Sequence, residues 1–105
     1  MVKKLSKRIE KKVNKFILAL KTDLNQIERI FLFGSYAKDE MTRDSDIDLC
    51  VVSSDFKKKN PWNYLWKKRI EIDDFYIQPI GYAPEDFIDE NPLVWEIKKT
   101  GIRIM

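Results

Sequence analysis

Residues 46–52, Asp-Ile-Asp-Leu-Cys-Val-Val, constrain the fold of this chain more than any other stretch. Their apolar and β-branched character predicts a central strand. Residues two apart in a strand point to the same face, so Asp46 and Asp48 lie side by side while the intervening apolar residues face the core. Two adjacent carboxylates repel each other and resist burial. We therefore expect a feature that offsets this cost, unless Asp46 merely ends the preceding loop and Asp48 lies on a solvated sheet face.

A divalent cation is one such feature, since Mg²⁺ commonly binds one or two carboxylates together with substrate phosphates. Shortly before the aspartates, Gly34-Ser35 follows a strand predicted at 28–33 and begins a helical turn predicted at 35–39. A glycine after a strand lets backbone N–H groups approach an anion, and a helical turn points its free N–H groups the same way. The stretch therefore combines a potential phosphate-binding turn with a potential metal-binding pair.

The remaining pattern predicts a small α+β domain over residues 1–105. A helix is expected over 3–20, a short helix over 62–68, a third strand over 70–80, a helix from Pro92 to the residue before Gly101, and a final extended piece. The apolar face of the first helix contains Leu5, Ile9, Val13, Ile17 and Leu20. This order predicts a mixed β-sheet of three to four strands with the helices packed mainly on one face.

Composition excludes several classes of function. The chain has no histidine, which removes histidine bases, Ser-His and Cys-His nucleophile pairs and most zinc sites. A single cysteine, Cys50, excludes an internal disulfide, and no apolar stretch has the length of a membrane span, so we predict a cytoplasmic protein. The net charge of +3 does not by itself indicate nucleic-acid binding, although lysines crowd the first helix.

The order of strand, Gly34-Ser35, short helix, loop, Asp46-x-Asp48 and strand resembles the DNA polymerase β-like nucleotidyltransferases. Within that superfamily, "GSYAKDEMTRDSDIDL" is most similar to the minimal nucleotidyltransferases, one-domain proteins often encoded beside a HEPN-domain partner. The C-terminal "PEDF" and "ENPLVWEIKKTGI" extend the resemblance to nearly the whole chain. One departure is Asp39, which stands where the family commonly has glycine after a basic residue.

The resemblance implies an Mg²⁺-dependent transfer of a nucleoside monophosphate, AMP from ATP in the first instance, to a hydroxyl. Gly34 and Ser35 would hold the triphosphate and Lys38 would contact phosphate. Asp46 and Asp48 would bind Mg²⁺, in a site for two ions. The family also uses a third carboxylate on a later strand. Here Asp74 is the candidate catalytic and metal-binding residue, with Asp73 as the alternative.

By the same resemblance, the acceptor would be a tyrosine of a HEPN toxin, which makes the chain an antitoxin of the type VII kind. Two alternatives stay open. The chain could neutralise a HEPN protein by binding alone, without catalysis. It could also be an RNA-binding accessory protein that uses the basic face of its first helix.

Overall fold

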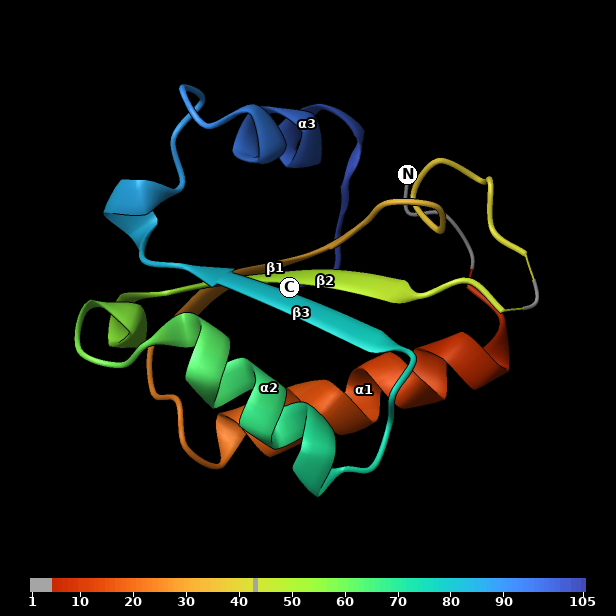
Figure 1. The fold of residues 1–105 in the computed structure, drawn as a ribbon, viewed down its shortest axis with the longest axis horizontal. Coiled ribbons are helices and arrows are strands. Elements are labelled where there is room, and N and C mark those ends of the chain that lie inside the picture. Colours follow the sequence, from red (N-terminus) through yellow and green to blue (C-terminus); the bar gives the residue numbers. More distant parts are fainter. Residues whose placement is uncertain (1–4, 43) are drawn as a thin grey trace.

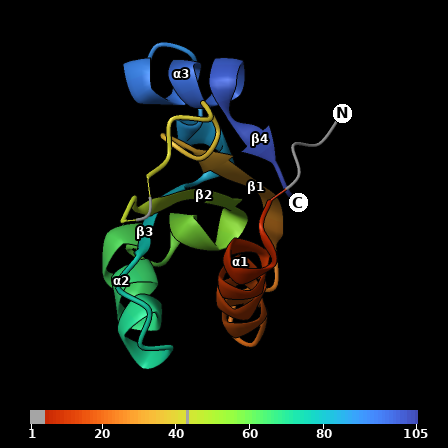
Figure 2. The same cartoon turned by 90° about the vertical axis from the view of Figure 1, so that its right-hand side faces the viewer.

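The computed structural model describes residues 5–42 and 44–105, which form a mixed sheet between two layers of helices. The helices are α1 (Lys7–Lys21), α2 (Pro61–Glu71) and α3 (Pro92–Thr100). The strands are β1 (Ile27–Phe33), β2 (Ile47–Ser53), β3 (Ile77–Tyr82) and β4 (Ile102–Arg103), with short 3₁₀ turns at Ser54–Lys57 and Pro84–Asp86. α1 and α2 cover one face of the sheet and α3 covers the other (Figures 1 and 2). The predicted α+β class is confirmed.

Strand β2 lies at the centre of the sheet, whose order is β3-β2-β1-β4. It pairs with β1 antiparallel and with β3 parallel, and α2 makes the crossover that a parallel connection requires. The register places Phe33 of β1 opposite Asp48, and Gln78 of β3 beside Asp48 on the other side. The start of β2 is therefore flanked by the end of β1 and the start of β3.

Helix α1 begins after Ser6, whose side chain accepts a hydrogen bond from the backbone N–H of Ile9 at 3.3 Å. Its buried side chains are Ile9, Val13, Phe16 and Leu20. The predicted helix is confirmed from Lys7 onwards, whereas Leu5, expected on its apolar face, lies before its start. The buried face is also slightly rotated. Phe16 is completely buried whereas the expected Ile17 is only half-buried, because steps of four, three and four keep the larger ring under the sheet.

The strand predicted over 70–80 is wrong in its first half. Helix α2 starts at Pro61 after the Asn60 cap and continues to Glu71, so Ile70 and Ile72 belong to the end of a helix. The chain then turns at Asp73, whose φ is +55°, and β3 begins only at Ile77. The alternation of apolar and acidic residues in this stretch resembles a strand, but the Asn-Pro start signal and the burial of Leu65 extend the helix.

The helix predicted to begin at Pro92 is confirmed. The Asn91 side chain accepts hydrogen bonds from the backbone N–H groups of Leu93 and Val94 at 2.9 and 3.3 Å, which caps α3. The final extended piece forms β4 beside β1. Within the described residues, no helix has the length and apolar character needed to cross a bilayer.

The sheet is buried on both faces. Towards α1 and α2, Ile47, Leu49 and Val51 of β2 pack with Phe16 and Leu65. Towards α3, a smaller cluster contains Phe31, Cys50, Val52, Phe87, Val94 and Ile97. The prediction that the odd-numbered residues of β2 face the main core is confirmed. Asp48 shares its side of the strand with Cys50, and it therefore lies at the border of the second cluster.

We expect Phe16→Ala to lower the free energy of unfolding by about 3 to 5 kcal/mol, because it removes a ring that is fully enclosed between α1 and the sheet. Leu18→Ala, on the same helix but 65% exposed, is the matched control and should change it by less than about 0.5 kcal/mol. Urea unfolding followed by circular dichroism measures both. Equal losses in the two variants would contradict the packing of α1.

Candidate active site

The Gly34-Ser35 turn begins where β1 ends. Gly34 has a φ of +74°, in the left-handed region that favours glycine. Its carbonyl accepts hydrogen bonds from the backbone N–H groups of Ala37 and Lys38, both at 3.1 Å, and the Ser35 carbonyl accepts one from Glu40 at 2.9 Å. These bonds form the predicted helical turn after the strand. A turn of this kind leaves its first N–H groups without partners inside the turn.

Gly34 and Asp48 lie in direct contact. A Cβ atom added at Gly34 would overlap Asp48 Oδ2 and lie 3.0 Å from Asp48 Cγ. Any side chain at position 34 would therefore displace the carboxylate, in addition to the strain of a positive φ. The structure thus brings together the two halves of the sequence motif, since the register of β1 with β2 places the turn against the second aspartate.

Asp46 and Asp48 form the acidic part of the site. Asp46 is exposed just before β2, and Asp48, the second residue of the strand, is half-buried. Burial and the neighbouring Asp46 carboxylate raise the pKa of Asp48 to about 6. A divalent cation would relieve this repulsion, and two carboxylates with substrate phosphates are a common Mg²⁺ ligand set. The donor set therefore fits Mg²⁺, although no group of three acidic, cysteine or histidine side chains converges within the described residues.

Asp39 occupies the position at which the family commonly has glycine. Its φ is +62°, so it adopts the left-handed conformation that glycine would favour. Aspartate tolerates this region better than most residues because its short polar side chain can form local hydrogen bonds. The loop between the turn and β2 thus keeps a glycine-like conformation without the glycine.

Lys38, predicted to contact phosphate, is engaged with α3. Its Nζ donates to Glu96 Oε1 at 2.7 Å, and this hydrogen bond raises the pKa of Lys38. Both side chains are exposed, so the pair contributes little to stability and is easily exchanged for another anion. The assignment of Lys38 to phosphate stays a prediction that requires release from Glu96.

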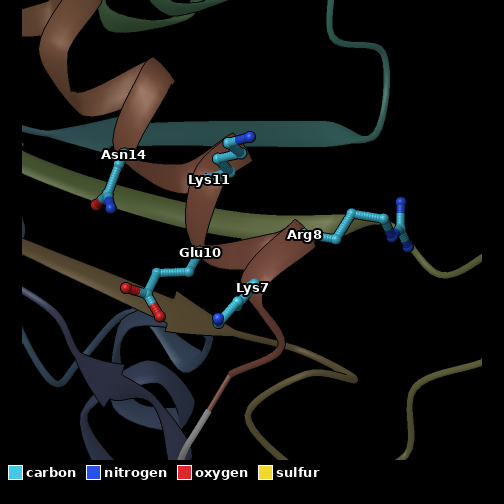
Figure 3. Close-up of a pocket in the computed structure, with 5 residues that line it drawn as sticks. All are labelled: Lys7, Arg8, Glu10, Lys11 and Asn14. Carbon is cyan, nitrogen blue, oxygen red and sulfur yellow. The ribbon is translucent and has the colours of Figure 1, made fainter.

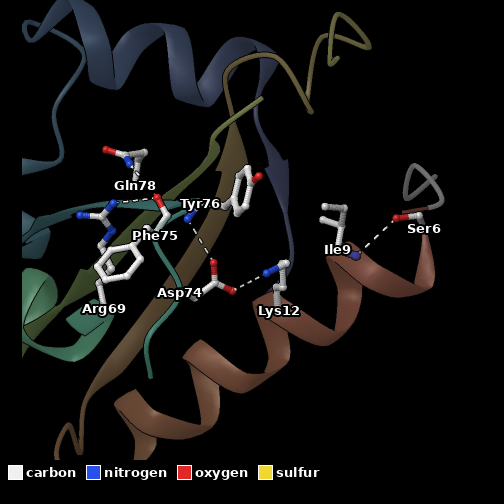
Figure 4. A network of polar contacts seen from close by, with 8 residues as sticks. All are labelled: Ser6, Ile9, Lys12, Arg69, Asp74, Phe75, Tyr76 and Gln78. Atoms are coloured by element: carbon white, nitrogen blue, oxygen red, sulfur yellow. Dashed lines mark hydrogen bonds and ion pairs between the residues drawn. The ribbon is translucent and has the colours of Figure 1, made fainter. Parts of the chain in front are cut away.

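Within the described residues, the Asp74 carboxylate does not converge with those of Asp46 and Asp48. It is buried, and its two oxygens are used elsewhere: Oδ2 accepts from Lys12 Nζ of α1 at 3.0 Å, and Oδ1 accepts from the backbone N–H of Tyr76 at 3.1 Å (Figure 4). These contacts tie the entry of β3 to α1. The sequence-based hypothesis that Asp74 is the third metal ligand would require the carboxylate to leave Lys12, and the experiment below tests it against Gln78. The alternative, Asp73, is exposed in the turn after α2.

Gln78 is the residue that sequence reasoning missed. The parallel register places it beside Asp48, and paired residues of neighbouring strands point to the same face. It is half-buried, and its Nε2 donates to the Phe75 carbonyl at 3.4 Å (Figure 4). The amide oxygen is an additional hard ligand near the carboxylates. The only signal in the sequence was strand parity, which puts Gln78 on the face opposite the buried Ile77, as the structure does.

The basic residues of α1 form a separate surface. A hollow of about 580 Å³ lies along the helix (Figure 3). Its lining residues are Lys7, Arg8, Glu10, Lys11 and Asn14. A second hollow of about 310 Å³ shares Arg8 and Lys11 and extends to Asp74. Gly34, Asp46 and Asp48 line neither hollow, so the basic helix surface and the candidate active site are distinct.

A mixed sheet in which a Gly-Ser turn contacts Asp48, the second of two closely spaced aspartates at the start of β2, is the arrangement expected of a nucleotidyltransferase fold. The family model for the nucleotidyltransferase domain matches residues 13–103. The chain therefore belongs to the nucleotidyltransferase domain family.

Individual relatives agree with this assignment. The chain is 46% identical over 44 residues to a candidate protein adenylyltransferase of Methanocaldococcus jannaschii and 40% identical over 42 residues to the protein adenylyltransferase MntA of Shewanella oneidensis. These matches span 41% and 40% of this chain but only 44% and 30% of the relatives. A toxin–antitoxin structure with AMP-PNP shares the fold, with a TM-score of 0.62 and 24% identity over 88% of this chain and 71% of that one. The resemblance to minimal nucleotidyltransferases is confirmed.

We expect Asp48→Asn to stabilise the protein at pH 8 and to have almost no effect at pH 4. The raised pKa means that folded Asp48 keeps its proton between pH 3.8 and about 6, so wild-type stability falls as the pH rises through this window. Because Asp48 is partly exposed, we expect Asp48→Asn to raise the free energy of unfolding at pH 8 by about 1 to 2 kcal/mol. Urea unfolding in EDTA measures it, with exposed Asp44→Asn as the control. An equal gain at both pH values would contradict the raised pKa.

We expect Gln78→Glu to strengthen Mg²⁺ binding roughly tenfold or more, because it adds a carboxylate beside Asp48. Isothermal titration calorimetry in the presence of AMP-PNP provides the measurement. Asp74→Asn should leave Mg²⁺ affinity unchanged and lower thermal stability, because Lys12 loses its ion-pair partner. The opposite pattern, weaker Mg²⁺ binding in Asp74→Asn and no gain in Gln78→Glu, would identify Asp74 as the third ligand.

Proposed function

We propose that this chain is an Mg²⁺-dependent adenylyltransferase that transfers AMP from ATP to a hydroxyl of a partner protein. The observation that carries the proposal is the contact between Gly34 and Asp48, since it joins an anion-binding turn to a pair of carboxylates. Neither the turn nor the carboxylate pair alone indicates a nucleotide site, but a triphosphate with its cation needs both. Family membership and the adenylyltransferase names of the matched relatives support the choice of reaction.

In this proposal, the turn at Gly34 and Ser35 holds the triphosphate through backbone N–H groups and the Ser35 hydroxyl. Asp46 and Asp48 would hold Mg²⁺, which when bound would supply charge neutralisation for the phosphates. The acceptor oxygen forms a bond to the α-phosphorus, and the bond from the α-phosphorus to the oxygen that bridges to the β-phosphate breaks. Pyrophosphate leaves with that oxygen, and the proton of the acceptor hydroxyl passes to water. The protein contributes mainly positioning and charge compensation, as in other phosphoryl and nucleotidyl transfers.

We further propose that the acceptor is a tyrosine of a HEPN-domain toxin, which the transfer would inactivate. The matched MntA is named a protein adenylyltransferase, and structures with the same fold come from toxin–antitoxin complexes. In this proposal the partner protein carries the acceptor hydroxyl to the nucleotide site.

Incubation with α-labelled ATP, Mg²⁺ and a HEPN-domain protein encoded in the same genome should label that protein. Asp46→Ala combined with Asp48→Ala should reduce labelling at least roughly a hundredfold, because the cation loses both protein ligands. Asp44→Ala, an exposed acid of the same loop, is the matched control. If the double variant still neutralises the toxin fully, the chain acts by binding alone; if the wild type transfers nothing, the proposed activity is wrong.

A further inference from the structure

The outer face of α2 carries an exposed strip of stacked aromatic and cationic side chains. The rings of Trp62 and Trp66 stack with centroids 4.8 Å apart, and the Arg69 guanidinium lies 4.5 Å from the Trp66 ring and 5.2 Å from the Phe75 ring. We call Trp62, Trp66, Arg69 and Phe75 the aromatic strip. Trp62 is 62% exposed and Phe75 is 59% exposed. Exposed aromatic side chains that gather in this way usually mark an interaction surface.

The aromatic strip leads to the candidate active site. The Phe75 carbonyl accepts hydrogen bonds from Arg69 Nη2 at 2.7 Å and from Gln78 Nε2 at 3.4 Å (Figure 4). Gln78 in turn lies beside Asp48 in the sheet register. One end of the strip, at Phe75, is therefore linked to Asp48 of the proposed metal site through Gln78. A molecule that lies along the strip would reach the start of β2.

The guanidinium of Arg69 has no anionic partner. Among the described residues, no carboxylate forms an ion pair with Arg69, whose Nη2 donates to the Phe75 carbonyl. Trp, Arg and Tyr are the residues that most often dominate the binding energy of protein interfaces. A partner with apolar side chains and a carboxylate would complement both the rings and the guanidinium.

We propose that the aromatic strip docks the protein that supplies the acceptor hydroxyl, through an apolar segment of that protein with a carboxylate facing Arg69. This inference rests on the proposed adenylyltransferase function for the identity of the partner. Helix α2 has 11 residues and is about 16 Å long, a length that two to three turns of a partner helix would match. The Phe75 end of the strip would bring the docked partner to the edge of the sheet at Gln78, the neighbour of Asp48.

Charge argues against a second copy of this chain, since self-association through the strip would place one Arg69 against another without an intervening carboxylate. Charge does not exclude a nucleic acid, because Lys59, Lys67 and Lys68 line a hollow beside the same helix. The ring geometry argues against one instead. The faces of the Trp66 ring are already used by Trp62 and Arg69, which leaves ring edges for aliphatic side chains rather than open faces for bases.

The test is the affinity of the intact chain for the HEPN-domain proteins encoded in the same genome, measured by biolayer interferometry. Trp62→Ala combined with Trp66→Ala should weaken binding roughly 30-fold or more. Phe75→Ala should weaken it in the same direction. Trp95→Ala is the matched control, since Trp95 is 51% exposed on α3, away from the strip, and it should change the Kd less than about twofold.

Circular dichroism and the affinity for Mg²⁺ with AMP-PNP should be unchanged in all variants, which separates docking from folding and from nucleotide binding. In the transfer assay, the strip variants should raise the KM for the acceptor protein and leave the KM for ATP unchanged. A wild-type chain that binds the partner through the strip but transfers no AMP would contradict the proposed function and support this inference.

Three outcomes would overturn the inference. One is that the wild type binds none of these HEPN-domain proteins, and another is that the strip variants bind as tightly as Trp95→Ala. The third is that the strip serves a different occupant. A dimer in sedimentation experiments that Trp62→Ala dissolves would assign the strip to a second copy, and binding of a fluorescent single-stranded RNA that the same change abolishes would assign it to nucleic acid.

Discussion

The position of β2 at the centre of the sheet determines the arrangement of the rest of the molecule. This strand is hydrogen-bonded on both edges and covered on both faces, so its register with each neighbour is strongly specified. A slip of one residue would turn Leu49 away from the main core and bury Asp48 in its place. The same register that buries the apolar residues therefore holds Asp48 at the border of the second cluster, where partial burial raises its pKa to about 6. The acidic site is a consequence of core packing.

The contact between Gly34 and Asp48 shows how closely the loop is coupled to this strand. The glycine at position 34 satisfies two separate requirements, a left-handed backbone and the absence of a Cβ atom next to the carboxylate. Asp39 satisfies only the first of these requirements at its own position, and an aspartate can do so at modest cost. This difference explains why the family glycine can be replaced at position 39, whereas a replacement at position 34 would disturb the site itself.

Sequence patterns predicted the elements well where periodicity and end signals agreed, as in the helix that begins at Pro92 and in β2. They failed over 70–76, where apolar and acidic residues alternate as in a strand but the helix started by Asn60-Pro61 continues. The Gly-Ser turn and the aspartate pair were recognisable because they are close in sequence. The neighbour of Asp48 on β3 depends on the register of two strands joined by a crossover, which no local pattern encodes. That is why the sequence favours Asp74, whereas the structure places Gln78 beside Asp48.

The crossover between β2 and β3 has a second consequence. Helix α2 carries the aromatic strip on its outer face, and its buried face, through Leu65, packs under the sheet. The turn that follows α2 holds Asp74 against Lys12 and the Phe75 carbonyl against both Arg69 and Gln78. One short segment thus fixes the proposed docking surface, the start of β3 and the amide beside Asp48. Because these three features meet in the turn that the Lys12–Asp74 pair links to α1, a partner bound at the Phe75 end of the strip would lie next to the neighbour of Asp48. Such positioning matters most in a transfer reaction that depends on alignment of the acceptor with the phosphorus atom.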